Sequence, residues 1–276
     1  MADFSRELEV ACRVAREAGR VIMEVYGTRF AFEEKAGDAG PVTEADTRAN
    51  ELIVSELRRA FPGDSIIAEE TSRRDETRSP RGWYIDPLDG TREFVDRNGM
   101  FAVHVGLAVD GVAALGVVYG PVEDKLYAGV VGQGCTLEAG GVKRALRVVP
   151  VRSANAVRLL VSRSHKSRET GLIARELGIT DVKEHGSVGL KCGLIAEGKA
   201  DLYLHASPRS SRWDACAPEA VLRAAGGALT DFAGAPYAYD GVELGNVRGL
   251  VAGSADALPL VMPVVTRIAR ESGLLR

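Results

Sequence analysis

Cysteine is scarce in this chain, and its placement excludes several classes of protein. The 276 residues include four cysteines, which are scattered along the chain without a Cys-x-x-Cys pair. That spacing predicts neither a disulfide framework nor a zinc site, and it is typical of reduced thiols inside a cell. We therefore expect a cytoplasmic protein.

The chain also lacks a strong charge of either sign. Its formal net charge is −3 at pH 7. Such a balance does not provide the basic surface that binds a nucleic-acid polymer. An anionic small molecule would have to be held by bound metal ions and a few local positive groups rather than by the overall field.

Long apolar runs are missing as well. No stretch of the sequence reaches the roughly 20 apolar residues that a membrane-spanning helix needs. Residues 1–26 form an amphipathic pattern with acidic and arginine side chains throughout, so we do not expect them to be a signal peptide. The sequence thus predicts a protein with no membrane partner.

The apolar residues that are present make up 46% of the chain and can fill one large core or two fused smaller ones. Their spacing predicts a helix that ends at Gly27 and a second over 43–60, followed by an antiparallel meander of strands over 101–109, 112–119, 125–131 and 135–138. From about residue 150, strands and helices are predicted to alternate, over 157–162, 167–177, 182–185, 188–197, 201–204, 214–225 and 228–231, before a last helix that ends at Ser272. This order predicts an α/β protein of one unit, 1–276, with an α+β half at about 1–149 and an α/β half at 150–276.

Residues 83–94 carry the most informative motif, Asp86-Pro87-Leu88-Asp89-Gly90-Thr91 within an apolar strand that leads toward a short helix. The proline is expected to stop the strand ladder, and the glycine allows a close backbone approach. Two carboxylates beside the free carbonyl of Leu88 suit a hard divalent cation such as Mg²⁺. The alternative is a plain polar turn, because Asp, Pro and Gly are common in turns.

Three further acids stand at the ends of apolar segments. Glu69 follows the apolar residues 65–68, Asp46 lies near the start of the helix over 43–60, and Asp214 stands where a helix N-cap belongs. Each acid alone is explained as a cap or a solvated charge. Several of them in one ordered pattern are not expected by chance.

This ordered set, completed by Trp213 and Gly226-Gly227, resembles the lithium-sensitive, magnesium-dependent inositol monophosphatase superfamily over nearly the whole chain. The resemblance implies a layered α-β-α-β-α sugar-phosphatase fold and hydrolysis of a phosphate monoester. It implies two or three Mg²⁺ ions, with Mn²⁺ as an alternative, and metal ligands at Glu69, Asp86, the Leu88 carbonyl, Asp89 and Asp214. Asp46 and Thr91 are implied as the pair that orients and deprotonates the attacking water.

Residues between these motifs are similar to the 3′(2′),5′-bisphosphate nucleotidase branch. The likeness rests on the runs 91–99, 162–165, 186–200 and 213–219. Inositol phosphatases usually have Asn at the position of Glu93, and they usually have Glu at the position of Ser207. The resemblance therefore implies conversion of 3′-phosphoadenosine 5′-phosphate to AMP and phosphate.

The same branch implies a set of substrate contacts. Backbone amides of Gly90 and Thr91 would hold the phosphoryl oxygens, and the side-chain candidates are Ser162, His165, Ser187, Lys191 and Arg212. Lys191 and Arg212 are candidates for a second phosphate, and His165 is a candidate for the adenosine. Without the resemblance, each would be interpreted as a solvated side chain. The sequence offers no aromatic pair to sandwich a purine, and His104 is expected to be a satisfied structural histidine.

Two other functions stay open. The chain could be a phosphatase for inositol or another sugar phosphate, or a non-catalytic relative that binds nucleotide or metal. In the enzymatic cases the partner is a small phosphorylated molecule, and the protein is expected to be a monomer or a homodimer.

Overall fold

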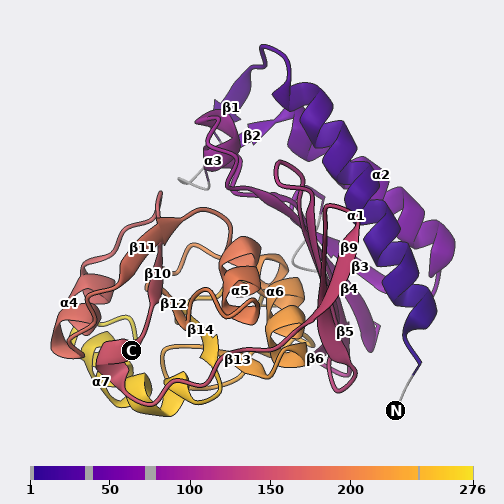
Figure 1. Cartoon of the computed structure of the whole chain (residues 1–276). Coiled ribbons are helices and arrows are strands. Elements are labelled where there is room, and N and C mark those ends of the chain that lie inside the picture. Colours follow the sequence, from indigo (N-terminus) through magenta and orange to yellow (C-terminus); the bar gives the residue numbers. More distant parts are fainter. Residues whose placement is uncertain (1–2, 35–39, 72–78, 242, 276) are drawn as a thin grey trace.

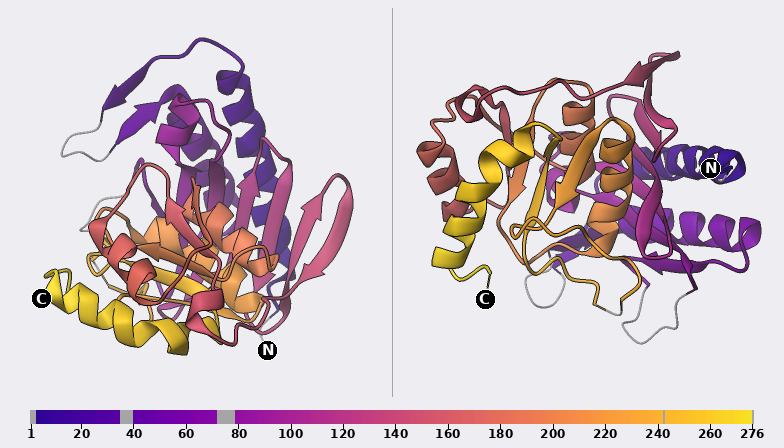
Figure 2. Two further views of the ribbon diagram at one scale, coloured as in Figure 1. Left: turned by 60° about the vertical axis from the view of Figure 1, so that its left-hand side comes forward. Right: turned by 90° about the horizontal axis from the view of Figure 1, so that it is seen from below.

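Two sheets and the helices around them form five layers, in the order helix, sheet, helix, sheet, helix (Figure 1). The structure is a computed structural model that describes residues 3–34, 40–71, 79–241 and 243–275. No described helix is long and apolar enough to cross a membrane. The helices α1 and α2 and the helix α7 lie on opposite outer sides of the molecule (Figure 2).

The larger sheet has seven strands in the order β3-β4-β5-β6-β7-β8-β9, and only the β3–β4 pair is parallel. Its strands are β3 (Ser65–Ala68), β4 (Arg81–Asp89), β5 (Ala102–Val109), β6 (Val112–Gly120), β7 (Lys125–Val130), β8 (Gly134–Ala139) and β9 (Val142–Leu146). The helices α1 (Ser5–Tyr26) and α2 (Glu44–Ala60) cover one face of this sheet. α1 does so because its small and branched apolar residues recur every three or four positions and are buried. A short hairpin of β1 (Phe32–Glu34) and β2 (Pro41–Thr43) lies between the two helices along the chain.

The smaller sheet has five strands in the order β11-β10-β12-β14-β13. They are β10 (Leu159–Ser162), β11 (Val182–His185), β12 (Leu202–His205), β13 (Gly227–Thr230) and β14 (Leu250–Ser254). β10 pairs in parallel with both of its neighbours, whereas β14 is antiparallel to its own. The helices α4 (Arg168–Glu176) and α7 (Ala257–Glu271) lie outside this sheet, and α5 (Val188–Ala196) and α6 (Arg212–Ala224) fill the layer between the sheets.

A row of glycines lets α6 lie directly on the larger sheet. Gly106, Gly116 and Gly129 are register neighbours across β5, β6 and β7. A Cβ atom on Gly116 would lie 2.2 Å from the carbonyl oxygen of Ala217 in α6, a separation that no real side chain tolerates. The backbone contact therefore depends on these glycines, and it sets where the first turn of α6 stands.

The predicted fold class and the layered architecture are confirmed by this arrangement. The sequence interpretation missed β1, β2, β9 and β14, which are all short strands. The prediction that Pro87 ends its strand is wrong. β4 continues to Asp89, and a register shift between Asp86 and Asp89 accommodates the proline.

Candidate active site

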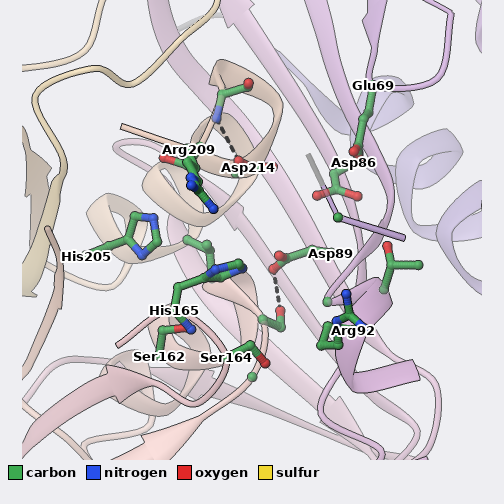
Figure 3. A pocket seen from close by; sticks show the side chains of 18 of the residues that line it. Glu69, Asp86, Asp89, Arg92, Ser162, Ser164, His165, His205, Arg209 and Asp214 are labelled. Carbon is green, nitrogen blue, oxygen red and sulfur yellow. Dashed lines mark hydrogen bonds between the residues drawn. The ribbon is translucent and has the colours of Figure 1, made fainter. Parts of the chain in front are cut away.

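A cavity of about 1090 Å³ collects most of the predicted site residues. It is lined by the C-terminal ends of β4, β10 and β12 and by the N-terminal ends of α5, α6 and the short helix α3 (Thr91–Val95). Figure 3 shows acidic side chains on one side of it and histidines on the other, with Asp89 between them.

Four carboxylates form what we call the acidic wall: Glu69, Asp86, Asp89 and Asp214. The amide of Glu69 donates to the Ile85 carbonyl at 3.1 Å, so the pairing of β3 with β4 brings Glu69 beside Asp86. Asp214 faces them from the first turn of α6 (Figure 3), where it accepts a hydrogen bond from the Ser211 amide at 2.7 Å. Ser211 is the N-cap, so the prediction that Asp214 itself caps the helix is wrong by three residues.

The register shift in β4 shapes the centre of this wall. The Leu88 amide donates to Asp86 Oδ1 at 3.0 Å, and this bond spans the irregular part of β4 at Pro87. Asp86 and Asp89 consequently line the same cavity although they are three residues apart on one strand. In a regular strand, residues three apart point to opposite faces.

The acidic wall is electrostatically strained. Burial, followed by the charges of Glu69, Asp89 and Asp214, raises the pKa of Asp86 well above its usual range. Burial and the neighbouring carboxylates raise the pKa of Asp214 to about 8. Buried like charges of this kind are stabilised by a cation, and the oxygen-only donor set fits a hard divalent ion. Among the described residues, no group of three or more acidic, histidine or cysteine side chains is arranged so that it could hold a metal ion.

Asp89 is the exception within the wall, because donors surround it. Its Oδ2 atom accepts from the Ser187 hydroxyl at 2.6 Å and the Gly189 amide at 3.2 Å, and it lies 3.1 Å from His104 Nε2. Burial alone would raise the pKa of Asp89, but His104, Lys191 and Ser187 outweigh burial and hold it below its usual range. His104 is fully buried, and its Nδ1 atom has no hydrogen-bond partner among the described residues, so the prediction of a satisfied histidine is wrong.

Asp46 and Thr91 meet behind this wall. The Thr91 hydroxyl lies 3.0 Å from Asp46 Oδ1 and 3.2 Å from the Leu88 carbonyl oxygen. The other oxygen of Asp46 accepts from the amide and the hydroxyl of Thr43, at 2.8 and 2.7 Å. Asp46 is completely buried, and this burial raises its pKa despite the hydrogen bonds. Thr91 lines the cavity, so its hydroxyl connects the cavity with Asp46.

The opposite side, which we call the nitrogen-rich wall, consists of His165, Lys191, His205 and Arg209. Lys191 is 2% exposed, its Nζ atom donates to the His185 carbonyl at 3.1 Å, and it lies 4.6 Å from the centre of the Tyr203 ring. Burial lowers its pKa to about 8. The two histidine rings meet edge to face with their centres 6.1 Å apart.

His205 is the least satisfied side chain of this wall. It is 6% exposed, and neither ring nitrogen has a hydrogen-bond partner among the described residues. Burial lowers its pKa to about 3, so the ring is neutral near pH 7. Buried polar groups are normally paired, so this ring is available to a ligand in the cavity.

Comparison with known families decides the assignment. Residues 3–268 match the model of the inositol monophosphatase family. The chain belongs to this family. The predicted membership is thereby confirmed over nearly the whole length of the chain.

Individual family members are similar to the chain at several levels. The 3′(2′),5′-bisphosphate nucleotidase CysQ of Escherichia coli (strain K12) is 38% identical over 235 residues, which cover 84% of this chain and 93% of that protein. The Nus factor SuhB of the same organism is 31% identical and covers 82% of this chain and 85% of its own length. The solved structure of CysQ from Bacteroides thetaiotaomicron matches with a TM-score of 0.75 and 29% identity, over 91% of this chain and 98% of that one. An IMPase from Thermotoga maritima matches with a TM-score of 0.81 and 25% identity, over 96% and 99%.

Most residues that the family resemblance singled out line the one cavity: Glu69, Asp86, Leu88, Asp89, Gly90, Thr91, Ser162, His165, Ser187, Lys191 and Asp214. Two of the polar candidates are already engaged, because the Ser162 hydroxyl accepts from the His165 amide and the Ser187 hydroxyl serves both Asp89 and the Leu190 amide. Both hydroxyls therefore shape the wall through these bonds.

The prediction that Arg212 contacts the substrate does not agree with the structure. Arg212 is absent from the cavity lining, and its guanidinium donates to the Ala238 and Gly245 carbonyls and to Asn246. It also stacks on Tyr237, 4.5 Å from the ring centre. These bonds fasten the segment that leads back to β14, so Arg212 supports the site from outside.

The sequence interpretation missed His205 and Arg209, which line this cavity. His205 is the last residue of β12, and its position at a strand end next to the Lys191 helix was the available signal. Arg209 had no such signal, because it lies in a loop between β12 and α6 with no motif around it. Only the folded chain brings it to the lining of the cavity.

Proposed function

We propose that this protein is a divalent-metal-dependent phosphatase of the 3′(2′),5′-bisphosphate nucleotidase type, converting 3′-phosphoadenosine 5′-phosphate to AMP and phosphate. The observation that carries the proposal is the pairing, in one cavity, of an acidic wall with a wall that holds a buried lysine and two histidines. The likeness to CysQ nucleotidases over most of both chains supports it.

The acidic wall supplies the metal ligands in this proposal. Glu69, Asp86, the Leu88 carbonyl, Asp89 and Asp214 would hold two or three Mg²⁺ ions, with Mn²⁺ as an alternative. When bound, such ions polarise the phosphoryl group and stabilise the developing negative charge. The raised pKa values of Asp86 and Asp214 support this role, because a cation relieves the repulsion that causes them.

Asp46 and Thr91 would move the proton of the attacking water. A water in the cavity can donate to the Thr91 hydroxyl, which in turn passes a proton to Asp46 at 3.0 Å. The raised pKa of Asp46 makes it a stronger base than an exposed carboxylate. The amides of Gly90 and Thr91 would hold the phosphoryl oxygens.

The nitrogen-rich wall would bind the rest of the nucleotide. Lys191 is positively charged below pH 8 and would meet the second phosphate, with Arg209 at the mouth of the cavity. His165 and His205 would contact the adenosine through ring faces and unpaired nitrogens. Only a substrate that carries a second phosphate and a base can make these contacts, because a small monoester does not extend to them.

Inositol 1-phosphate is the second candidate substrate, because an IMPase from Thermotoga maritima has the same fold at a TM-score of 0.81. Ser207 argues against it. The Ser207 hydroxyl accepts from the Arg209 amide at 3.2 Å, and Ser207 does not line the cavity. A non-catalytic role is the third candidate, and the likeness to a Nus factor keeps it in view. Lithium inhibition, a cytoplasmic location and a monomeric or homodimeric state remain predictions.

Product identification tests the proposal. Purified protein with Mg²⁺ and 3′-phosphoadenosine 5′-phosphate should release phosphate and AMP, distinguished from adenosine 3′-phosphate by ³¹P NMR. Addition of EDTA should stop the release, and excess Mg²⁺ should restore it. Absence of phosphate release would leave the non-catalytic role, and release that EDTA does not affect would contradict the metal site.

A further inference from the structure

Glu93 is a buried acid at the edge of the cavity, and it belongs to neither the acidic wall nor the nitrogen-rich wall. It stands in α3, two residues after Thr91, and it is 4% exposed. Acids are seldom buried without partners, because an uncompensated charge in a protein interior is costly. The partners of Glu93 therefore show what it does.

Its carboxylate contacts the loop that follows β10. Glu93 Oε1 accepts a hydrogen bond from the Ser164 hydroxyl and lies 3.4 Å from Arg163 Nε. Arg163 also pairs with Asp96 at the end of α3. The next residue of this loop is His165, whose ring faces the cavity (Figure 3). The helix α3 thus fixes the backbone that carries His165.

The aliphatic part of Glu93 packs against a second segment of the nitrogen-rich wall. A Cβ atom on Gly186 would lie 2.4 Å from Glu93 Cγ, so the side chain rests directly on the Gly186 backbone. The residue before Gly186 is His185, whose carbonyl accepts from Lys191 Nζ and also from the Arg163 amide at 3.3 Å. One side chain therefore touches both segments that position His165 and Lys191.

We infer that Glu93 is a positioning residue that determines the preference for a nucleotide bisphosphate. It joins the helix that begins at Thr91, where the scissile phosphate would lie, to the loops that carry the contacts for the rest of the nucleotide. This inference rests on the proposed function. It names the side chain that holds the two ends of the substrate site at a fixed separation.

Three variants test the inference by comparing 3′-phosphoadenosine 5′-phosphate with p-nitrophenyl phosphate. Glu93→Ala removes the hydrogen bond and the packing, so kcat/KM for the bisphosphate should fall about 10- to 100-fold, mostly through KM. Hydrolysis of p-nitrophenyl phosphate should change little. Glu93→Gln keeps the acceptor for Ser164 and the contact with Gly186, and it should restore most of the preference. Glu184→Gln is the matched control, because its ion pair with Lys166 is exposed and lies outside the cavity.

Ser164→Ala provides an independent test should Glu93→Ala fold poorly, which thermal unfolding would show. It removes the same hydrogen bond from the other side, so it should also lower kcat/KM for the bisphosphate and spare p-nitrophenyl phosphate. In the double variant, this fall in kcat/KM should not add to the fall caused by Glu93→Ala. Equal loss on both substrates, or a preference unchanged in Glu93→Ala and Ser164→Ala, would overturn the inference while the proposed function stands. A wild-type enzyme without preference for the bisphosphate would overturn both.

Discussion

The two walls of the cavity differ in how they are built. The acidic wall comes from the ends of β3 and β4 and from the first turn of α6, and these elements are fixed by the strand ladder and by the glycine row under α6. The nitrogen-rich wall comes from single residues on β12, α5 and two loops. The acidic wall therefore suits the chemistry that is common to every phosphate ester. The nitrogen-rich wall suits the selection of one ester over another, because each of its side chains can vary without moving the acids.

Charge separates the walls in the same way. Burial and the neighbouring carboxylates raise the pKa values of Asp86 and Asp214, and a bound cation would relieve that repulsion. The nitrogen-rich wall has a lysine whose pKa is lowered to about 8 by burial and a histidine that is neutral at pH 7. We expect that wall to bind an anion and a polar ring. Variants on the two walls should therefore fail differently.

The largest effect is expected for Asp89→Asn on the acidic wall. Bound metal contributes several kcal/mol to such reactions, so kcat should fall about 10³-fold for every phosphate monoester tested. The fold should survive, because Asn can still accept from Ser187 and Gly189. Steady-state kinetics with two substrates checks this, with the exposed Asp181→Asn as the control. Normal turnover by folded Asp89→Asn would contradict the metal-site assignment.

A smaller and selective effect is expected for Lys191→Ala on the nitrogen-rich wall. Loss of a hydrogen bond to a charged phosphate costs about 1.5–3 kcal/mol, so kcat/KM for the bisphosphate should fall roughly 10- to 150-fold. Turnover of p-nitrophenyl phosphate should stay nearly the same, since that ester does not extend to Lys191. The exposed Lys199→Ala provides the matched control. If Lys191→Ala slowed both substrates equally, the two walls would not divide the work as described.

The smallest effect concerns stability and separates the walls without any turnover. The pKa of Asp214 is about 8 in the fold and 3.8 in the reference state, so the metal-free fold binds more protons across this interval and loses stability as pH rises through it. Mg²⁺ binds the ionised carboxylates, and its stabilisation should grow over the same interval. At a Mg²⁺ concentration about 100 times the dissociation constant at pH 8, Tm should rise by about 5 °C at that pH. The same Mg²⁺ concentration should raise Tm much less at pH 5.

Scanning calorimetry of the wild type and of Asp214→Asn checks that expectation. The variant should be the more stable of the two without metal at pH 8, because one repelling charge is gone, and it should respond less to Mg²⁺. Lys191→Ala should respond to Mg²⁺ as the wild type does. An equal Mg²⁺ shift at both pH values would show that the acidic wall does not bind the ion through ionised carboxylates.

The difference between the walls also explains what the sequence could predict. Asp86 and Asp89 belong to one short motif, and Asp46, Glu69 and Asp214 each mark the end of an apolar segment, so local rules drew attention to them and the family resemblance supplied their roles. The pairing of Asp46 with Thr91, which the resemblance implied, agrees with their 3.0 Å hydrogen bond, whereas the bond from the Glu69 amide to β4 was not predicted. The register shift at Pro87 did not follow, since it depends on pairing with β5.

The nitrogen-rich wall was predicted less well, because its residues are brought together only by tertiary packing. His165 and Lys191 were found through the family resemblance, whereas His205 and Arg209 were missed. Arg212, a candidate for the second phosphate, does not line the cavity, because its position near Asp214 in the sequence does not determine where its side chain points. The strand β14 was overlooked for the same reason, because no motif marks it in the sequence.

The most direct test of the central claim is the ratio of kcat/KM for 3′-phosphoadenosine 5′-phosphate to that for inositol 1-phosphate, measured on the wild-type protein with Mg²⁺. We expect a ratio well above one, because only the bisphosphate uses Lys191 and the histidines, and because Ser207 does not line the cavity where inositol hydroxyls would lie. A ratio below one would contradict the assignment of the nitrogen-rich wall to a nucleotide.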